Sequence, residues 1–498
     1  MTHANAVSMP RIKVLLAVFM FAVQIAAGVW ANSAFDEAFT GRTMRFDYYH
    51  SGTAGEEHIS LDRLRLEGDW PGRRAGMIDR ANLGKYRFSV LDTESGATLF
   101  ATGFSSIYGE WETTGEARGG AWRTLHESQR FPEPRRPVEL RLEKRADNGE
   151  FVEFHREALD PASRIVDRSP IPRRGVAWPL FENGPPAEKV DLLVLGDGYS
   201  ADEQEDYRND VEKVVNALFS FPPFAERRDD FNVWAIDAAA ERSGITRPRA
   251  GIWNTTPIGL TYNAFDSERY MLTFANREMR ELAALAPYDA LILIANSNKY
   301  GGGGIYNLYS TAAAKSAQLP YLIVHEFGHA FAGLGDEYYT SSVAYEDFIA
   351  PGTEPWEPNI TALLDSEALK WGALADPDTP LPTAWGQQAY DRISLDFQKV
   401  RGELRAGGAS EVRMDAYFAE VAATTDPMLR SAEYYGRVGA FEGAGYQAKG
   451  LYRPAVDCIM FSRNPDHYCP VCAAAVDEVI DLHLGHYALA GGSAENQP

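Results

Sequence analysis

The most constraining feature of this sequence is the run HEFGHAFAGLGDEYY at residues 325–339. The residues before and inside it are largely apolar, so the pattern predicts a buried helix with His325 and His329 on one face. Gly333 and Gly335 predict the end of that helix, where the chain can turn back toward the histidines. Any fold of this chain therefore has to bring two imidazoles close to the carboxylates that follow.

The HExxH spacing is typical of zinc hydrolases, because two imidazoles one helical turn apart can bind one Zn²⁺ ion. Glu326 lies between them and is the candidate general base, the group that takes a proton from water. Asp336 is our first choice for the third metal ligand, and Glu337 is its rival. The alternative is an amphipathic helix with two structural histidines, which the glycine break and the paired carboxylates disfavour.

The third ligand separates two classes of zinc peptidase. In metzincins it follows HExxH after a glycine, and a tight turn carrying a methionine lies far downstream. Here the glycine and the ligand fall one position late, on Gly333 and Asp336, and Met460 is the candidate for the Met-turn. In thermolysin-like zincins a second helix supplies a glutamate, for which Glu346 and Glu367 are candidates. The carboxylate pair and the methionine favour the first class.

These motifs, with Tyr-Arg-Pro at 452–454 and Cys-Pro-Val-Cys at 469–472, resemble the IgA-peptidase-type zinc metallopeptidases, a metzincin-like family. The similarity extends from about residue 190 to the Cys-Pro-Val-Cys segment. The region before residue 190 resembles the N-terminal accessory domain of that family. The resemblance implies that His325 and His329 bind zinc and that Glu326 is the general base. It also implies that Met460 forms the Met-turn.

We therefore expect an exported hydrolase that cleaves a protein or peptide substrate with zinc-activated water and Glu326. The family name does not identify immunoglobulin as the substrate. One alternative is a catalytically degenerate module that binds protein or glycan, which the intact Glu326 disfavours. The other is a peptidase of the thermolysin-like class with a downstream glutamate ligand.

The whole sequence predicts an α+β fold with two domains. Residues 32–165 contain segments that alternate apolar and polar residues, such as 86–91 and 138–142, and predict a β-sandwich accessory domain. Prolines and a double arginine predict a linker at 166–180. Residues 181–490 are then expected to form the metallopeptidase domain.

The upper part of that domain, residues 181–339, is expected to hold a mixed sheet beneath the active-site helix. Apolar runs predict strands at 190–195, 231–236 and 290–294, and a capping box at Ser200 predicts a helix toward Leu218. Four glycines at 301–304 precede a further strand predicted at 305–310. We hypothesise that an extended substrate pairs with this edge; a flexible connector is the alternative.

The lower part, residues 340–490, is expected to close the cleft and to end in the Met-turn. Helical patterns recur at 360–371 and 390–405, and a last helix is predicted at about 471–486.

All three cysteines lie between Cys458 and Cys472. In an oxidising compartment this predicts a disulfide from Cys458 to Cys469 or Cys472, with one thiol left over. A zinc site built from Cys469, Cys472, His483 and His486 is the alternative, but its spacing falls short of the zinc-finger pattern.

Residues 1–31 place Arg11 and Lys13 before an apolar stretch that ends at Ala31, a pattern typical of a signal peptide. We expect cleavage near Ala31 and a secreted or periplasmic protein without membrane insertion; a single membrane anchor is the alternative. The formal charge is −22, and −24 once the two basic residues are removed, which disfavours binding to nucleic acid or anionic membranes. The sequence does not indicate an oligomeric state.

Overall fold

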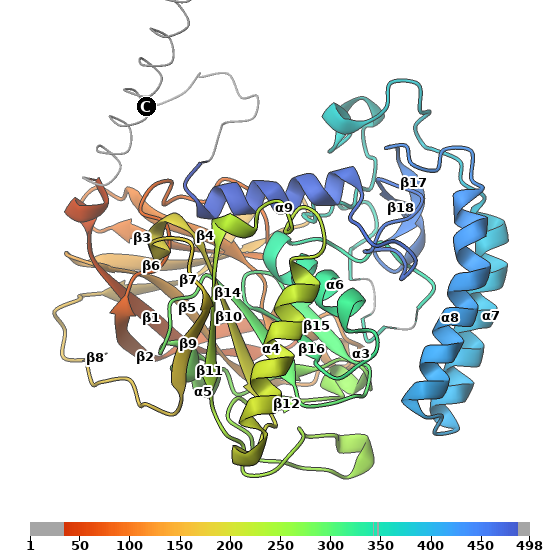
Figure 1. Cartoon of the computed structure of the whole chain (residues 1–498). Helices are drawn as coiled ribbons and strands as arrows, with labels where there is room; N and C mark the ends of the chain where they lie inside the picture. The colour runs from red at the N-terminus through yellow and green to blue at the C-terminus, as the bar shows by residue number, and fades with distance from the viewer. Residues whose placement is uncertain (1–33, 342, 346–347, 487–498) are drawn as a thin grey trace, which may run out of the picture.

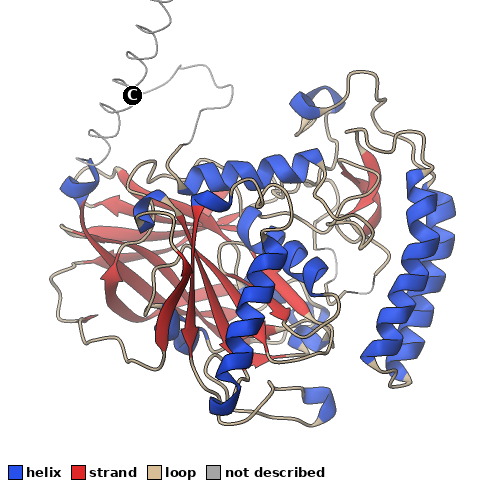
Figure 2. Ribbon diagram, viewed as in Figure 1, coloured by secondary structure: helices blue, strands red, loops and turns tan. Residues whose placement is uncertain are grey.

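The fold is that of a computed structural model, which describes residues 34–341, 343–345 and 348–486 (Figure 1). The expected signal peptide, residues 1–31, and the alternative ligand Glu346 lie outside these described residues. Helices and strands are combined as an N-terminal sheet domain followed by a mixed α/β domain (Figure 2), which confirms the α+β class.

The N-terminal region is a sandwich of two four-stranded sheets. The first sheet has the order β5 (Arg123–Pro134), β1 (Phe39–Gly52), β2 (Glu57–Asp69), β8 (Val166–Asp167). The second has the order β4 (Thr98–Phe104), β3 (Tyr86–Asp92), β6 (Val138–Arg145), β7 (Phe151–Leu159). Phe46, Phe88 and Phe131 are fully buried between the sheets. Strands β3 and β6 confirm the alternating segments expected at 86–91 and 138–142.

Two short helices follow β4 and face the second domain: α2 (Ile107–Trp111) and α3 (Gly115–Arg118). The side chain of Ser106 caps α2 by accepting a hydrogen bond from the backbone of Gly109. Nearby, the backbone N–H of Ser105 donates to the carbonyl oxygen of Tyr306 over 3.0 Å. This contact joins the sandwich to the sheet that carries the candidate site.

The second domain is built on a six-stranded sheet. Its order is β15 (Gly302–Ile305), β16 (Tyr309–Ala313), β14 (Ala290–Ala295), β10 (Val190–Asp197), β11 (Phe231–Asp237), β9 (Val176–Phe181). The four central strands are parallel, and the two edge strands, β15 and β9, run antiparallel to their neighbours. This confirms the mixed sheet and the strands expected at 190–195, 231–236 and 290–294.

Helices cover both faces of this sheet (Figure 1). One face packs against α4 (Gln204–Leu218), α6 (Leu319–Ala332) and α9 (Pro470–His483), and the other against α5 (Asn276–Ala283). Along β10, Leu192 and Val194 face the first group of helices, and Leu193 and Leu195 face the second. Because both faces are buried, the strand is continuously apolar. The capping box expected at Ser200 is present at the start of the segment that leads into α4.

The glycine run forms the edge strand itself. The strand expected at 305–310 has the wrong boundary, because residues 306–308 turn the chain and Asn307 has a positive φ of 54°. Glycine is required because β15 runs directly against α6. A Cβ atom on Gly304 would lie 2.3 Å from the backbone oxygen of Glu326 and 2.8 Å from Cβ of His329.

Replacing Gly304 by alanine is therefore expected to destabilise the protein by about 1–3 kcal/mol, since the strand or the helix has to move. The free energy of unfolding in urea measures this. Gly68→Ala is the matched control, because Gly68 also lies in a strand and nothing is within 4 Å of the added Cβ. Equal losses of stability in the two variants would contradict the close packing of β15 on α6.

The lower part of the second domain holds an antiparallel helical pair, α7 (Gln387–Ala406) and α8 (Glu411–Arg430), and a hairpin of β17 (Phe441–Ala444) and β18 (Gln447–Arg453). A small two-stranded sheet, β12 (Leu260–Thr261) with β13 (Leu272–Thr273), lies in the upper part. Across the described residues, no helix is both long and apolar enough to cross a membrane.

The helix expected at 360–371 is wrong, whereas α7 confirms the one expected at 390–405 and α9 the one expected near 471–486. The first segment is largely irregular because Thr361 exchanges two backbone hydrogen bonds with Tyr452, of 3.1 and 2.8 Å. Leu363 adopts a positive φ of 51°, which no helix accommodates. Of the apolar residues in this segment, Ile360, Leu369 and Trp371 are buried, whereas Leu364 is exposed.

Candidate active site

Helix α6 brings the two histidines of the HExxH motif to one face and ends at Gly333, which has a left-handed φ of 64°. The chain then reverses and returns Asp336 to the same point. Oδ1 of Asp336 lies 3.0 Å from Nε2 of His325 and 3.2 Å from Nε2 of His329. The two Nε2 atoms are 3.2 Å apart. Three ligand-type atoms thus form a nearly equilateral triangle.

Backbone carbonyl groups fix the orientation of both imidazoles. The Nδ1–H group of His325 donates to the carbonyl oxygen of Ile459 over 3.0 Å, and that of His329 donates to Leu334 over 2.5 Å. A carbonyl oxygen can only accept, so in the neutral imidazoles the proton is on Nδ1 and the Nε2 atoms carry the lone pairs, which face each other. Oδ1 of Asp336 is buried, and within the described part of the chain the two Nε2 atoms are the polar groups that it faces.

This arrangement fits a divalent metal ion. Ligand atoms held tetrahedrally by zinc at about 2.0–2.1 Å lie roughly 3.3 Å from one another. The three separations in the triangle, 3.0 to 3.2 Å, are close to that value. Without a cation, three lone-pair atoms repel one another at this distance unless a proton lies between them.

The pKa values of His329 and Asp336 also show that the site favours a positive charge. Burial alone lowers the pKa of His329, but the carboxylate of Asp336 outweighs it and raises that pKa to about 9. Burial alone raises the pKa of Asp336, but the facing histidines hold it well below its usual range. A bound metal ion would take the place of the shared proton.

Tyr446 holds the other oxygen of Asp336. Its hydroxyl group donates to Oδ2 over 2.5 Å, and the backbone N–H of the preceding Gly445 donates to the carbonyl oxygen of Asp336 over 2.9 Å. The hairpin of β17 and β18 therefore orients the third candidate ligand. Such outer contacts fix the geometry of a metal site.

Glu326 lies beside the triangle and against the edge strand. A Cβ atom on Gly302 would lie 3.0 Å from its Oε1 atom. Burial raises the pKa of Glu326, while the two neighbouring histidines oppose that shift. A carboxylate with a raised pKa takes up a proton more readily than an exposed one.

Glu326 and the triangle open into a cavity of about 460 Å³ that both domains line. From the sandwich side, Glu110 of α2 accepts hydrogen bonds from the hydroxyl groups of Tyr270 and Tyr345, the latter over 2.8 Å. Burial raises the pKa of Glu110 to about 7. The N-terminal domain is thus part of the wall of the cavity.

Met460 lies beneath α6, in a turn in which the N–H of Phe461 donates to the carbonyl oxygen of Cys458. Its side chain is fully buried, and a Cβ atom on Gly328 would lie 3.3 Å from its sulfur. The carbonyl oxygen of Met460 accepts from the N–H of Glu337 over 3.0 Å. The turn therefore supports both α6 and the loop that carries Asp336.

Other residues suggested by the sequence lie elsewhere. Glu367 is exposed, and Glu337 points away from the histidines toward the cysteines. Of the two tyrosines that follow Glu337, Tyr338 lines the cavity. The hydroxyl group of Tyr339 donates to Asp391 instead.

The expected disulfide is wrong: Cys458, Cys469 and Cys472 are unbridged and buried. The alternative zinc site is also wrong, because His483 does not lie near Cys469 and Cys472. His483 lies near the C-terminal end of α9, stacked on Phe331, whereas the cysteines lie at its N-terminal end. A straight helix keeps these two groups apart, so one ion cannot bind both.

Comparison with known proteins assigns the chain to a family. The protein-family model described as IgA Peptidase M64 matches residues 178–480, and the one described as Peptidase M64 N-terminus matches residues 34–156. A search of curated proteins returned no match. The first match spans more than half of the chain and contains the whole triangle with Glu326. The protein therefore belongs to the IgA peptidase M64 family of metallopeptidases.

Proposed function

We propose that this protein is an exported zinc-dependent peptidase that hydrolyses peptide bonds. His325, His329 and Asp336 are the proposed zinc ligands, and Glu326 is the proposed general base. The observation that carries the proposal is the triangle of lone-pair atoms, 3.0 to 3.2 Å on each side, next to a buried carboxylate in a large cavity. Export rests on the pattern of residues 1–31 and stays a prediction, as do the domain boundaries.

The proposed chemistry divides between the metal ion and the chain. When bound, zinc lowers the pKa of a coordinated water toward about 7 and polarises a carbonyl oxygen. Glu326 takes the proton of the attacking water and returns it to the nitrogen of the leaving amine. Ile459 and Leu334 keep both imidazoles in the tautomer that presents Nε2. Met460 supports the loop of Asp336 from below, the place of a Met-turn.

The substrate is proposed to bind as an extended peptide along the edge of the sheet. At Gly302 this edge is already occupied, because the N–H of Met271 donates to its carbonyl oxygen and its own N–H donates to Arg269. Beyond that point Gly303 and Gly304 line the cavity beside Glu326. Backbone groups alternate in direction along β15, so those of Gly303 face Thr311 of β16 and those of Gly304 face outward, as at Gly302. Substrate backbone is proposed to pair with Gly304 by strand addition.

Removal of the metal tests the proposed function. The purified protein is expected to cleave denatured proteins or a library of fluorogenic peptides, to lose that activity on dialysis against a chelator, and to regain it with Zn²⁺. The readouts are cleavage rate and zinc content, measured on the same samples. Cleavage that persists after the zinc content has fallen to zero would refute a metal-dependent mechanism.

A further inference from the structure

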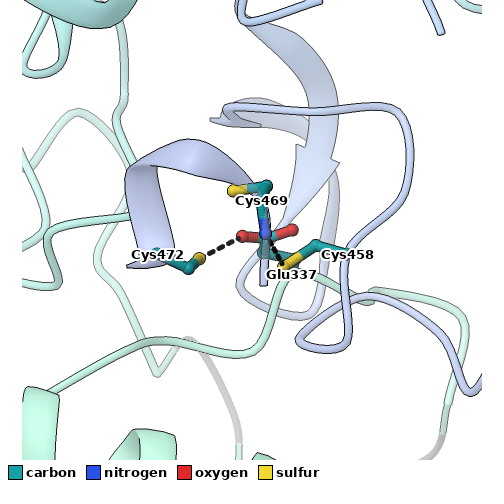
Figure 3. A group of neighbouring side chains, drawn as sticks. All are labelled: Glu337, Cys458, Cys469 and Cys472. Atoms are coloured by element: carbon teal, nitrogen blue, oxygen red, sulfur yellow. Dashed lines mark hydrogen bonds between the residues drawn. The ribbon is translucent and has the colours of Figure 1, made fainter. Parts of the chain in front are cut away.

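A second group of ligand-type side chains lies next to the loop of Asp336. It consists of Glu337, Cys458, Cys469 and Cys472, and one ligand atom of each lies within 4.8 Å of those of the others (Figure 3). All four residues are buried, and the most exposed of them, Cys469, is only 2% accessible. Four buried metal-binding groups converge from three separate segments of the chain.

Local structure places each member. The N–H of Glu337 donates to the carbonyl oxygen of Met460, so the loop is tied to the turn that begins at Cys458. Cys469 is the N-terminal cap of α9, and Cys472 lies in its first turn. The N–H of Cys469 donates to the sulfur of Cys458 over 3.2 Å. The helix start also favours negatively charged sulfur.

The carboxylate of Glu337 lacks the partners that a buried charge requires. Its Oε1 atom accepts from Nδ2 of Asn359 over 3.0 Å and from the thiol of Cys472 over 3.2 Å. Its Oε2 atom is buried and has no hydrogen-bond partner among the described residues. The buried Arg453 donates instead to the carbonyl oxygens of Gly443 and Val456. An unpaired buried carboxylate is costly, so this group needs a cation or a proton.

A disulfide does not satisfy this cluster. It would join two of the three sulfur atoms and leave the third thiol beside the unpartnered carboxylate. A four-coordinate cation would engage all four groups at once, and thiolate-rich tetrahedral sets select zinc among the common divalent ions. We propose that Glu337, Cys458, Cys469 and Cys472 form a second, structural zinc site, distinct from the triangle on α6.

Such a site would act on the first one through the chain. Glu337 directly follows Asp336, and Cys458 begins the turn whose Ile459 and Met460 carbonyl oxygens hold His325 and the loop. A metal ion here would fasten this loop, this turn and the start of α9 to one another. It would thereby fix the position of Asp336 without contacting the substrate cavity.

The test uses the full chain with the first site removed. The variant His325→Ala/His329→Ala is expected to retain one zinc ion per chain, whereas the unmodified protein holds two. X-ray absorption at the zinc edge should show sulfur neighbours at about 2.3 Å in the variant. Denatured in chelator without reductant, both proteins should give three titratable thiols. A variant without zinc, or a protein with a single titratable thiol, would overturn the proposal.

Single substitutions locate the metal. Cys472→Ser and Glu337→Gln are expected to lower the zinc content of the double-histidine variant. His483→Ala is the control, because His483 belongs to the alternative ligand set and lies at the far end of α9. Loss of this zinc in the control, with retention in Cys472→Ser, would refute the assignment. If Cys472→Ser does not fold, the zinc and thiol contents of the double-histidine variant still decide the question.

Discussion

Replacement of Glu326 by glutamine is expected to lower kcat by about 10²–10⁴-fold while the protein keeps its zinc. Glutamine has the same shape and can still lie against Gly302, but it cannot accept a proton from water. The cavity and the triangle of ligand atoms do not depend on its charge. A fluorogenic peptide assay gives the rate, and elemental analysis of the same preparation gives the zinc content.

The matched control for this variant is Glu367→Gln. Glu367 is exposed and is the alternative third ligand in the thermolysin-like interpretation of the sequence. This control should keep both zinc and activity. Because both variants make the same chemical change, a difference between them comes from the position of Glu326 in the site. Activity of Glu326→Gln within a few fold of the parent would remove Glu326 from the proposed role.

The second large effect is expected from Asp336→Ala, which should lose the zinc ion held by the histidines together with nearly all activity. The substitution removes the one carboxylate, among the described residues, that faces both Nε2 atoms. Tyr446→Phe removes only the hydrogen bond to Oδ2, so its zinc affinity should fall less, by about 10–100-fold. Competition with a zinc chelator of known affinity measures the zinc affinities of the unmodified protein, Tyr446→Phe and Asp336→Ala.

These measurements also decide whether Asp336 or Glu337 is the third zinc ligand. Glu337→Ala is expected to keep zinc on the histidines, because the carboxylate of Glu337 points into the cysteine cluster. In a preparation that binds two ions, spectra of cobalt-substituted protein tell the two losses apart, since only a sulfur-bound ion shows intense thiolate absorption. Zinc retained at the histidines of Asp336→Ala would assign the third ligand to another residue.

The parts of the fold that the sequence predicted have strong local patterns. Strands β10, β11 and β14 are apolar runs buried on both faces, and α6 carries its own helix stop at Gly333. The helix expected at 360–371 failed because pairing between Thr361 and Tyr452 competes with helix formation. Contacts across 91 positions leave no trace in the local periodicity that predicts a helix.

The same reasoning explains which site residues the sequence revealed. His325, Glu326 and His329 are close in sequence, and the turn to Asp336 follows at once. Tyr446 is 110 positions from Asp336, and Glu110 is 160 positions from Tyr270. No spacing rule joins such pairs, so only the folded chain shows that they meet. The three cysteines are close in sequence, but Glu337 lies 121 positions before Cys458, which made a disulfide the simpler expectation.

The partly occupied edge at β15 has a consequence for the proteins that this chain can cut. If Gly304 pairs with substrate as proposed, the segment that reaches Glu326 first has to lose its own backbone hydrogen bonds. A compact globular target offers such segments only at hinges, tails and loops, or during brief local opening. Cleavage would then report how often a target opens locally, and the resistance of a folded protein would be set by its own stability rather than by its sequence.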